Sequence, residues 1–379
     1  MNFPIIVSGL NDILVAADGK RYIDLVSANG AALLGHAHPG IGAAIAAQLG
    51  ELWLIGNLPT PVYLDAKHEV EHLFPQNFQL SGFYSTGMEA AEFALRVART
   101  ITGKNGVAGF ENSMHGKSLA TASLTWNNGD GLHIPGWHRL PFLPRLGEDD
   151  ILAEVARTLA MQPVGALLVE SLLGSAGGHM ASPEFYRALA GLAREHGTLL
   201  VWDEILTGFH RTGHAFRFLE LGVTPDVVLI GKACGNGFPV SGVVVARQHA
   251  PSQRMLPGST YANNPLACTA VGATLRHMGA LDMGARAAAV AQVVREHLGW
   301  LDESPIALRG QGALWVVELP ASADLGALVQ GLFDDGVCVG HSGRQFRIMP
   351  AATIEPAHLE QACAVISARL RQLEPGRPA

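Results

Sequence analysis

The sequence predicts an α/β protein in which a large domain holds a mostly parallel, doubly wound sheet and a smaller domain has an α+β arrangement. In the middle of the chain, helical stretches alternate with short continuous apolar runs, as in parallel sheets buried on both faces. After Leu281 this rhythm changes to a long helical stretch followed by strand-like runs. With 48% apolar and 16% charged residues, the 379-residue chain has ample material for a large core.

The first elements are a hairpin and a helix. "ILVAADGKRYIDLVSA" contains two strand-like runs around Asp18-Gly19, a dipeptide that favours tight hairpin turns. A helix is expected after Pro39, in "GIGAAIAAQLGELW". We assign residues 1–40 to a hairpin segment that packs with the small domain.

The large domain is expected to span residues 41–280. "MEAAEFALRVART" has apolar residues at helical spacing, whereas "VGALLVE", "TLLVWDE", "DVVLIGK" and "SGVVVAR" have the continuous apolar character of buried parallel strands. Between the first two of these runs, "SPEFYRALAGLAREHG" has Ser182 as N-cap, Pro183 in the first turn and Gly197 as C-cap. A strand, a helix and a strand in succession indicate a doubly wound sheet.

The small domain is expected to span residues 281–379. Its sequence begins with a long helical stretch, "RAAAVAQVVREHLGWL", and ends with another, "PAHLEQACAVISARLRQL". Between them, "GALWVVELP", "VCVGHSG" and "QFRIMP" resemble strands.

Charge and composition argue against several classes of protein. Lys+Arg total 26 and Asp+Glu 33, a scattered net charge of -7 that favours neither nucleic acid nor an anionic membrane as partner. The N-terminus lacks a signal peptide's positive region, and no run reaches the roughly 18 apolar residues of a membrane span. The four cysteines lie far apart without a pairing motif, so we expect reduced thiols in a cytoplasmic protein.

Charged residues end three of the apolar runs: Glu170, Asp203 and Lys232. Ligands of doubly wound sheets bind at the carboxyl ends of the strands, so two carboxylates and a lysine are expected at one edge. A largely buried lysine has a lowered pKa and can attack carbonyl carbons.

A turn before a helix predicts an anion site. "YSTGMEAAEFALRVAR" places Ser85, Thr86 and Gly87 at a helix N-terminus, where free backbone N–H groups suit a phosphate. A phosphate site, an amine and an acid together are what pyridoxal 5'-phosphate requires, for its phosphate, its aldehyde and its ring nitrogen. The residues therefore predict this cofactor.

Longer motifs resemble one family. "DEILTGFHRTG", "DVVLIGKACGNGFPVSG" and "GSTYANNPLA" closely resemble the class III (subgroup II) aminotransferases, which are fold-type I pyridoxal-phosphate enzymes. "YIDLVSANGAALLGHAHPGIGAAIAAQL" and "STGMEAAEFALRVAR" match the same family upstream, so the resemblance covers roughly residues 12–370. Leu206, after "DEI", is reminiscent of the glutamate-1-semialdehyde aminomutases within this family.

The resemblance implies roles for individual residues. Lys232 is then the Schiff-base lysine, Asp203 the acid that keeps the pyridine nitrogen protonated, and Ile205 the side chain packed on the ring face. Thr260 would reach the phosphate of the cofactor in the partner subunit, which implies a homodimer. Further contacts with the cofactor or its surroundings are implied for Thr86, Gly87, Met88, Met114, His115 and Glu170.

Three positions depart from the family pattern. Met88 stands where the family usually has Ser or Thr, and Met114 stands where an aromatic residue usually stacks on the ring. Ser175, in "LLGSAGG", occupies the place of a glutamate that gates a substrate-binding arginine in ornithine- and aminobutyrate-type members. Because Ser175 carries no charge, we expect a monocarboxylic amino acid or a simple amine to be a better donor than glutamate.

Substrate contacts are expected in two regions. Trp53, Asn57 and Tyr63 lie in a stretch that lines the substrate entrance in relatives, with core or dimer packing as the alternative. Arg347, in "RIMP", stands where relatives often place an arginine for a substrate carboxylate, with a structural ion pair as the alternative; Arg344 lies beside it.

Two shorter motifs favour other classes of enzyme. "HEVEH", from His68 to His72, fits the zinc-protease pattern, but no obvious third ligand follows and Pro75 ends a short helix. "HGKS", from His115 to Ser118, is similar to a P-loop but has Glu111 in place of the required first glycine.

The resemblance thus implies an aminotransferase that moves an amino group between a small amine or amino acid and a keto acid or aldehyde. An aminomutase or racemase of the same fold is the alternative, and a catalytically inactive binding protein on this fold is a more remote one. The intact Asp203 and Lys232 argue against the inactive protein.

Overall fold

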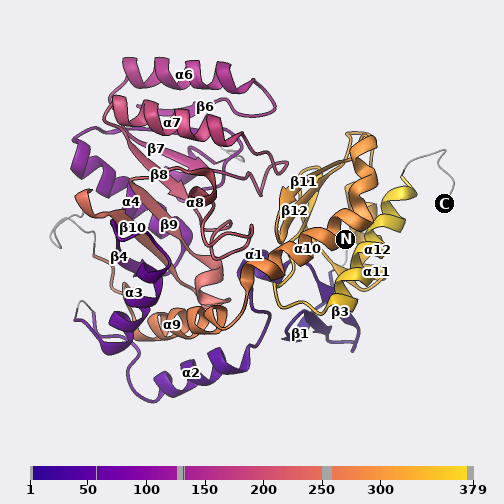
Figure 1. Ribbon diagram of the computed structural model, residues 1–379. Coiled ribbons are helices and arrows are strands. Elements are labelled where there is room, and N and C mark those ends of the chain that lie inside the picture. The colour runs from indigo at the N-terminus through magenta and orange to yellow at the C-terminus, as the bar shows by residue number, and fades with distance from the viewer. Residues whose placement is uncertain (1–2, 57, 126–130, 132, 250–257, 374–379) are drawn as a thin grey trace.

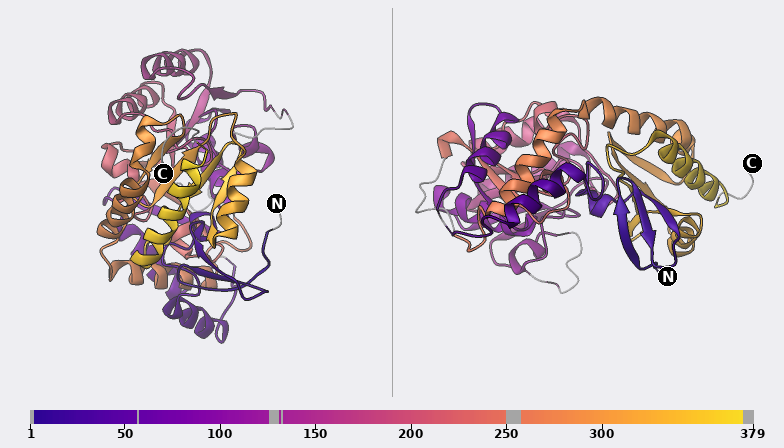
Figure 2. Two further views of the ribbon diagram at one scale, coloured as in Figure 1. Left: turned by 90° about the vertical axis from the view of Figure 1, so that its right-hand side faces the viewer. Right: turned by 90° about the horizontal axis from the view of Figure 1, so that it is seen from below.

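The chain folds into two lobes, a large one around a central sheet and a smaller one that holds both described ends (Figure 1). The structure is a computed structural model, which describes residues 3–56, 58–125, 131, 133–249 and 258–373. In both views of Figure 2 the N-terminal strands lie beside the C-terminal elements, as predicted for the hairpin segment.

A sheet of seven strands forms the centre of the large lobe. Its strands are β4 (Phe78–Tyr84), β5 (Gly106–Phe110), β6 (Trp137–Leu140), β7 (Val164–Glu170), β8 (Leu199–Asp203), β9 (Val227–Ile230) and β10 (Ser241–Ala246). Their order is β4-β10-β9-β8-β7-β5-β6, and all neighbours from β9 to β6 pair in parallel.

Strand β10 runs antiparallel to both β4 and β9. The prediction that "SGVVVAR" is a parallel strand is therefore wrong. A strand buried on both faces is apolar throughout in either direction, so its pattern contains no sign of direction. The prediction of a mostly parallel, doubly wound sheet is confirmed.

Helices cover both faces of this sheet (Figure 1). The longer ones are α2 (Pro39–Leu49), α3 (Pro61–His72), α4 (Gly87–Thr102), α6 (Glu148–Met161), α7 (Pro183–Glu195) and α9 (Pro265–Gly279), and the short ones are α5 (Leu119–Ala122), α8 (Arg217–Leu221), η1 (Lys232–Gly235) and η2 (Arg247–His249). Alternate residues of β8 face opposite sides, so Val201 packs with α4 while Trp202 packs with Tyr186 of α7. In the described part of the chain, each helix is too short or too polar to cross a bilayer.

The helix ends largely follow the signals in the sequence. Ser182 caps α7, accepting a hydrogen bond from Phe185 N at 3.1 Å. The C-cap is His196 instead of the predicted Gly197, which follows it with a left-handed φ of +58°. The glycine therefore lies one position beyond the cap, where a left-handed residue ends many helices.

The small lobe combines C-terminal and N-terminal segments. One sheet has the order β11-β12-β15-β14 and the other β1-β2-β3-β13, in which β13 pairs in parallel with β3. The strands are β1 (Ile6–Leu10), β2 (Ile13–Ala16), β3 (Arg21–Asp24), β11 (Ala307–Gln311), β12 (Leu314–Glu318), β13 (Val337–Cys338), β14 (Gly340–Ser342) and β15 (Gln345–Ile348). The helices are α10 (Met283–Leu298), η3 (Gly299–Glu303), α11 (Leu325–Asp334) and α12 (Pro356–Arg371). The expected strands and the two long helices are present, whereas β11 and α11 were not predicted.

Candidate active site

The three apolar runs that end on charged residues finish at the same edge of the large sheet. Glu170 at the end of β7 lies in register with Asp203 at the end of β8. Asp203 in turn lies in register with Leu229 of β9, three residues before Lys232. The structure therefore brings the two carboxylates and the lysine together, as the sequence predicted.

Asp203 is buried and held from two sides. Its Oδ1 accepts a hydrogen bond from Ile205 N at 3.0 Å, and its Oδ2 lies 2.8 Å from His115 Nδ1. Burial is the largest single effect on the pKa of His115 and lowers it, but the hydrogen bond with Asp203 and the charges of Asp203 and Glu170 together raise this pKa by more, so the net shift is upward. A histidine that favours its protonated form stabilises Asp203 as a carboxylate.

Glu170 holds the loop that carries His115. Its Oε2 accepts a hydrogen bond from Met114 N at 2.6 Å. The pKa of this carboxyl group is raised to about 7, and burial is the largest cause. Glu170 therefore holds the backbone of the loop that follows β5, and its charge also acts on His115 and Lys232.

Lys232 has the features of a reactive amine. Burial lowers the pKa of its ammonium group, and Nζ donates no hydrogen bond to any residue that the structure describes. Its backbone has a left-handed φ of +45°, which is unfavourable for a side chain of this size and is found mostly at functional sites. The fold therefore holds an unpartnered amine at the edge of the sheet.

The first turn of α4 presents backbone donors at the same edge. Thr86 caps the helix, its Oγ1 accepting from Glu89 N at 3.2 Å, and Ser241 Oγ donates to Thr86 O at 2.6 Å. The N–H groups of Gly87 and Met88 lie in the first turn, where no helical partner exists, and they have no acceptor among the described residues. These two N–H groups suit an anion.

Ile205 connects the helix end with the lysine. A Cβ added to Gly87 would meet Ile205 Cδ1 at 2.7 Å, and one added to Gly231, next to Lys232, would meet Ile205 Cγ2 at 3.3 Å. The unpaired N–H groups, the free amine, the buried acid and the apolar Ile205 fit the phosphate, aldehyde, ring nitrogen and ring of pyridoxal phosphate. The orphaned, buried Nε2 of His115 agrees with a site completed by a bound group.

Glu204, the second acid of the "DE" pair, serves the loop that follows β8. It is fully buried, and its carboxylate accepts hydrogen bonds from Phe218 N at 2.9 Å and from Thr207 Oγ1. Burial raises the pKa of Glu204 to about 7. The two adjacent acids therefore differ in role. Asp203 lies at the site, and Glu204 holds the backbone of the loop that follows β8.

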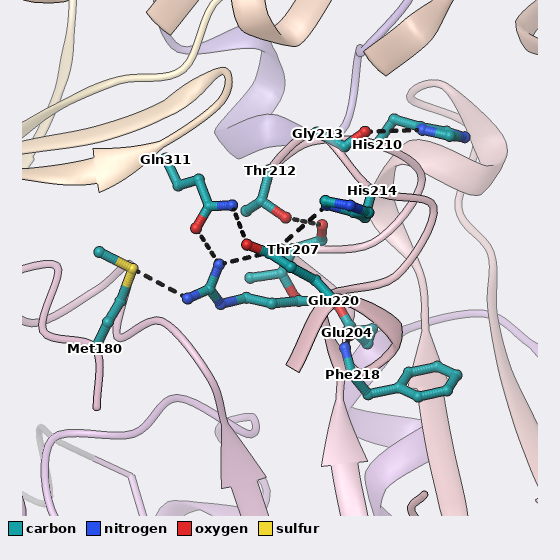
Figure 3. A network of polar contacts seen from close by, with 11 residues as sticks. Met180, Glu204, Thr207, His210, Thr212, Gly213, His214, Phe218, Glu220 and Gln311 are labelled. Carbon is teal, nitrogen blue, oxygen red and sulfur yellow. Dashed lines mark hydrogen bonds and ion pairs between the residues drawn. The ribbon is translucent and has the colours of Figure 1, made fainter. Parts of the chain in front are cut away.

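The helix that follows this loop, α8, is joined to the small lobe by the polar network in Figure 3. Arg217 Nη1 donates to Glu220 Oε2 at 3.3 Å and to Gln311 of β11. Gln311 Nε2 closes the network by donating to Glu220 Oε1 at 2.7 Å. This network joins α8 of the large lobe to β11 of the small lobe.

The two arginines near "RIMP" differ in their partners. Arg344 is exposed and forms an ion pair with Glu318 at 3.3 Å, the structural alternative. Arg347 forms no ion pair within the described residues; its Nη2 donates to Asn29 Oδ1 at 3.3 Å, and its Nε is buried without a partner. Burial lowers the pKa of Arg347. Ser175 lines a cavity of about 520 Å³ between the lobes, together with Arg344.

Trp53, Tyr63 and Thr260 were also expected near the substrate or the cofactor. Trp53 is 61% exposed, Tyr63 packs edge-on against Phe83, and Thr260 is exposed. No hydrogen bond or ring contact joins any of the three to Asp203 or Lys232 in the part of the chain that the structure describes. Asn57 lies outside the described residues.

The competing motifs form no second site. The rings of His68 and His72 lie 6.2 Å apart on α3, but no cluster of three metal-ligating side chains occurs among the described residues. In "HGKS", Ser118 caps α5 and Lys117 is exposed.

Two residues at the site were missed by the sequence analysis. Ser241 is the first residue of the apolar strand β10. The only sign of its role in the sequence is a hydroxyl group at the start of a buried run. Arg211, within the quoted "GFHRTG", is fully buried and donates to the carbonyl oxygens of Gly30, Ala313 and Pro350. The sequence gives no local signal for the burial of Arg211, because its immediate neighbours His210 and Thr212 are polar.

Known proteins resemble the chain over almost its whole length. The sequence pattern of the class III aminotransferases matches residues 2–370. An acetylornithine aminotransferase of Listeria innocua is 31% identical over 98% of this chain and 96% of its own length, and a 2-aminoadipate transaminase of Pseudomonas putida is 31% identical with the same coverages. In structure, the chain is similar to a PLP-bound amine transaminase from an uncultivated Pseudomonas species, with a TM-score of 0.89, 24% identity, and coverage of 98% of this chain and 95% of the other.

Proposed function

The chain belongs to the class III aminotransferase family, and we propose that it moves an amino group from a small amine or amino acid to a keto acid or aldehyde through Lys232. The observation that carries the proposal is the meeting at one sheet edge of the unpartnered Lys232, the Asp203–His115 pair and the free N–H groups of α4. Each of the three fits a different polar part of the family's cofactor, pyridoxal phosphate.

The chain's own residues then divide the work. The N–H groups of Gly87 and Met88, with Thr86 and Ser241 beside them, would hold the phosphate, while Asp203 would hold a proton on the ring nitrogen. When bound, pyridoxal phosphate supplies an aldehyde for an amine and a ring that withdraws electrons from the bond to be broken. Lys232 Nζ would hold the aldehyde end of this group until a donor amine takes its place, and as a free amine it would then accept a proton from the donor carbon.

Three features support Lys232 as that base. Burial lowers its pKa, which favours the neutral amine that a base requires. It has no hydrogen-bond partner that must be broken first in the described structure. The carboxylate of its neighbour Asp203 already forms hydrogen bonds with His115 and with Ile205 N.

The donor is predicted to be an amine or an amino acid with a single carboxylate, and not glutamate. In the described structure Arg347 has no acid to pair with, and Ser175 cannot provide one. We expect alanine or a simple amine to convert the cofactor faster than glutamate in single-turnover half-reactions followed by absorbance. Faster conversion by glutamate than by alanine and every amine tried would show that this reasoning is wrong.

The reaction class itself is tested by product analysis. A panel of amines is incubated with pyruvate or 2-oxoglutarate, and mass spectrometry identifies which molecules gain and lose nitrogen. We expect transfer of the amino group to the keto acid. Retention of nitrogen on a rearranged or inverted donor would instead indicate the aminomutase or racemase.

The enzyme is proposed to be a homodimer in which Thr260 serves the neighbouring site. The exposure of Thr260 in the single chain, together with exposed apolar side chains at Tyr261, Trp53 and Leu64, supports this proposal. The four cysteines are free, which suits a reducing compartment such as the cytoplasm.

Subunit exchange tests the shared site. Thr260→Ala should lower cofactor affinity by about 10-fold or more, because a phosphate loses charge-assisted hydrogen bonds. Mixing it with inactive Lys232→Ala protein should restore activity, since each mixed dimer then has one site that is wild type at both positions. Mass tags verify the exchange, and no gain in activity after verified exchange would place Thr260 within its own chain's site.

A further inference from the structure

A strained turn lies between β3 and α2. Ser27, Ala28 and Asn29 all have left-handed backbones, with φ of 44°, 52° and 56°, and Gly30 follows with φ of 85°. Consecutive left-handed residues are rare, and glycine, asparagine and aspartate adopt this conformation more readily than other residues. The carboxylate of Asp24 accepts backbone N–H groups at the start of the turn, at 2.7 and 3.0 Å, and so holds it in place.

This turn contacts two guanidinium groups near the active lysine. Arg211 Nη2 donates to Gly30 O at 3.1 Å, and Arg347 Nη2 donates to Asn29 Oδ1 at 3.3 Å. Burial is the main cause of the lowered pKa of Lys232, and the positive charges of Arg347 and Arg211 add to it, so both lie within electrostatic reach of the amine.

The two arginines differ in how many of their N–H groups already have a hydrogen-bond partner. Arg211 also donates to two further backbone carbonyl oxygens and is fully buried. Arg347 has Asn29 Oδ1 as its one hydrogen-bond partner among the described residues, and its buried Nε has none. A partly buried guanidinium that faces only a neutral amide keeps its full positive charge for an incoming anion.

We propose that Asn29 is a specificity-determining residue that selects donors with a carboxylate. Its Oδ1 orients Arg347, and its Nδ2, which donates to no described residue, is free to bind the same carboxylate. An acid at this position would neutralise Arg347 and compete with the substrate. The inference rests on the proposed function and narrows it, because monocarboxylic amino acids should bind better than amines without a carboxylate.

Asn29→Asp and Asn29→Gly form a matched pair for the test. Both residues tolerate the left-handed backbone, so the turn is retained, and only Asp adds a charge. Asn77→Asp, at an exposed position before β4, adds the same charge elsewhere. Intact folding and cofactor binding are checked for each variant by the absorbance spectrum and the melting temperature.

The first measurement needs no turnover. Propanoate is titrated calorimetrically into each cofactor-loaded protein. Asn29→Asp should weaken its binding by about 10-fold or more, because an ion pair must then be broken, while Asn29→Gly should weaken it by roughly 3-fold. Equal weakening by Asp and Gly, or an effect of Asp no larger than that of Asn77→Asp, would overturn the proposal.

The second measurement compares donors that differ by a carboxylate, alanine with ethylamine and 4-aminobutanoate with propylamine. In at least one pair, Asn29→Asp should lower the ratio of kcat/KM for the acid to kcat/KM for the amine by about 10-fold, mainly through KM. If wild-type protein converts no donor but Asn29→Asp still weakens propanoate binding, the transaminase proposal fails and the role of Asn29 stands. If wild type is active and the Asp variant binds propanoate as tightly, only the role of Asn29 fails.

Discussion

Replacing Lys232 by alanine is expected to abolish transamination. The variant would lose the amine that, in our proposal, both binds the aldehyde of the cofactor and moves the proton. Positioned acid–base groups contribute about 10²–10⁴-fold to a rate, so a loss of about 10⁴-fold or more is expected once the covalent role is included. Single-turnover half-reactions with the preferred donor measure this loss.

Borohydride reduction identifies the lysine independently of activity. The sequence has five lysines, Lys20, Lys67, Lys104, Lys117 and Lys232, so peptide mapping can distinguish them all. Reduction of the yellow protein should place the cofactor on Lys232. A label on any other lysine would contradict the assignment even if the alanine variant is inactive.

Lys104→Ala is the matched control. Lys104 is also held close to the fold, since its Nζ donates to the carbonyl oxygens of His196 at 2.6 Å and Gly197 at 3.0 Å. The substitution removes the same side chain just before the start of β5. Because β5, β7 and β8 are parallel, this start lies at the edge of the sheet opposite to Glu170 and Asp203. We expect this variant to keep a half-reaction rate within about 3-fold of wild type, a barrier change of under 1 kcal/mol.

Local patterns were enough to predict most of the strands and the edge at which they end. Glu170, Asp203 and Lys232 each follow an apolar run directly, and parallel strands bring such positions together. Thr86 was likewise predictable because a capping residue is read from its immediate neighbours. These predictions succeeded because each depends on residues close in the chain.

Features that depend on distant partners were not predictable from patterns. The hydrogen bond between Arg347 and Asn29 joins residues 318 positions apart. The left-handed backbone at Ala28 has no sequence signal, since alanine disfavours it and only the surrounding structure holds it there. The antiparallel direction of β10 is set in the same way, by pairing with β4 and β9.

The pairing of His115 with Asp203 was also not predictable from the sequence, although His115 was expected near the cofactor. The two residues lie 88 positions apart, and the resemblance implied no contact between them. The structure therefore adds a hydrogen-bonded histidine with a raised pKa beside the buried carboxylate of Asp203. The second prediction concerns the negative charge of Asp203.

Replacing Asp203 by asparagine is expected to slow the half-reaction by about 10²–10³-fold, or roughly 3–4 kcal/mol in barrier. Asparagine keeps the shape and can still accept the hydrogen bond from Ile205 N, so folding should be nearly intact. What is lost is the negative charge that holds a proton on the ring nitrogen. Without that proton the ring withdraws electrons poorly from the donor carbon.

Asp226→Asn separates this effect from the loss of an acid–histidine pair elsewhere on the sheet. Asp226 accepts a hydrogen bond from Leu200 N at 2.9 Å and lies 2.7 Å from His249 Nε2, a similar pair at the start of β9. Because β8 and β9 are parallel, the start of β9 lies at the opposite edge of the sheet from Asp203 at the end of β8. Asp226→Asn should therefore leave the half-reaction within about 3-fold of wild type. If Asp203→Asn is slowed no more than Asp226→Asn, the charge of Asp203 has no part in the reaction.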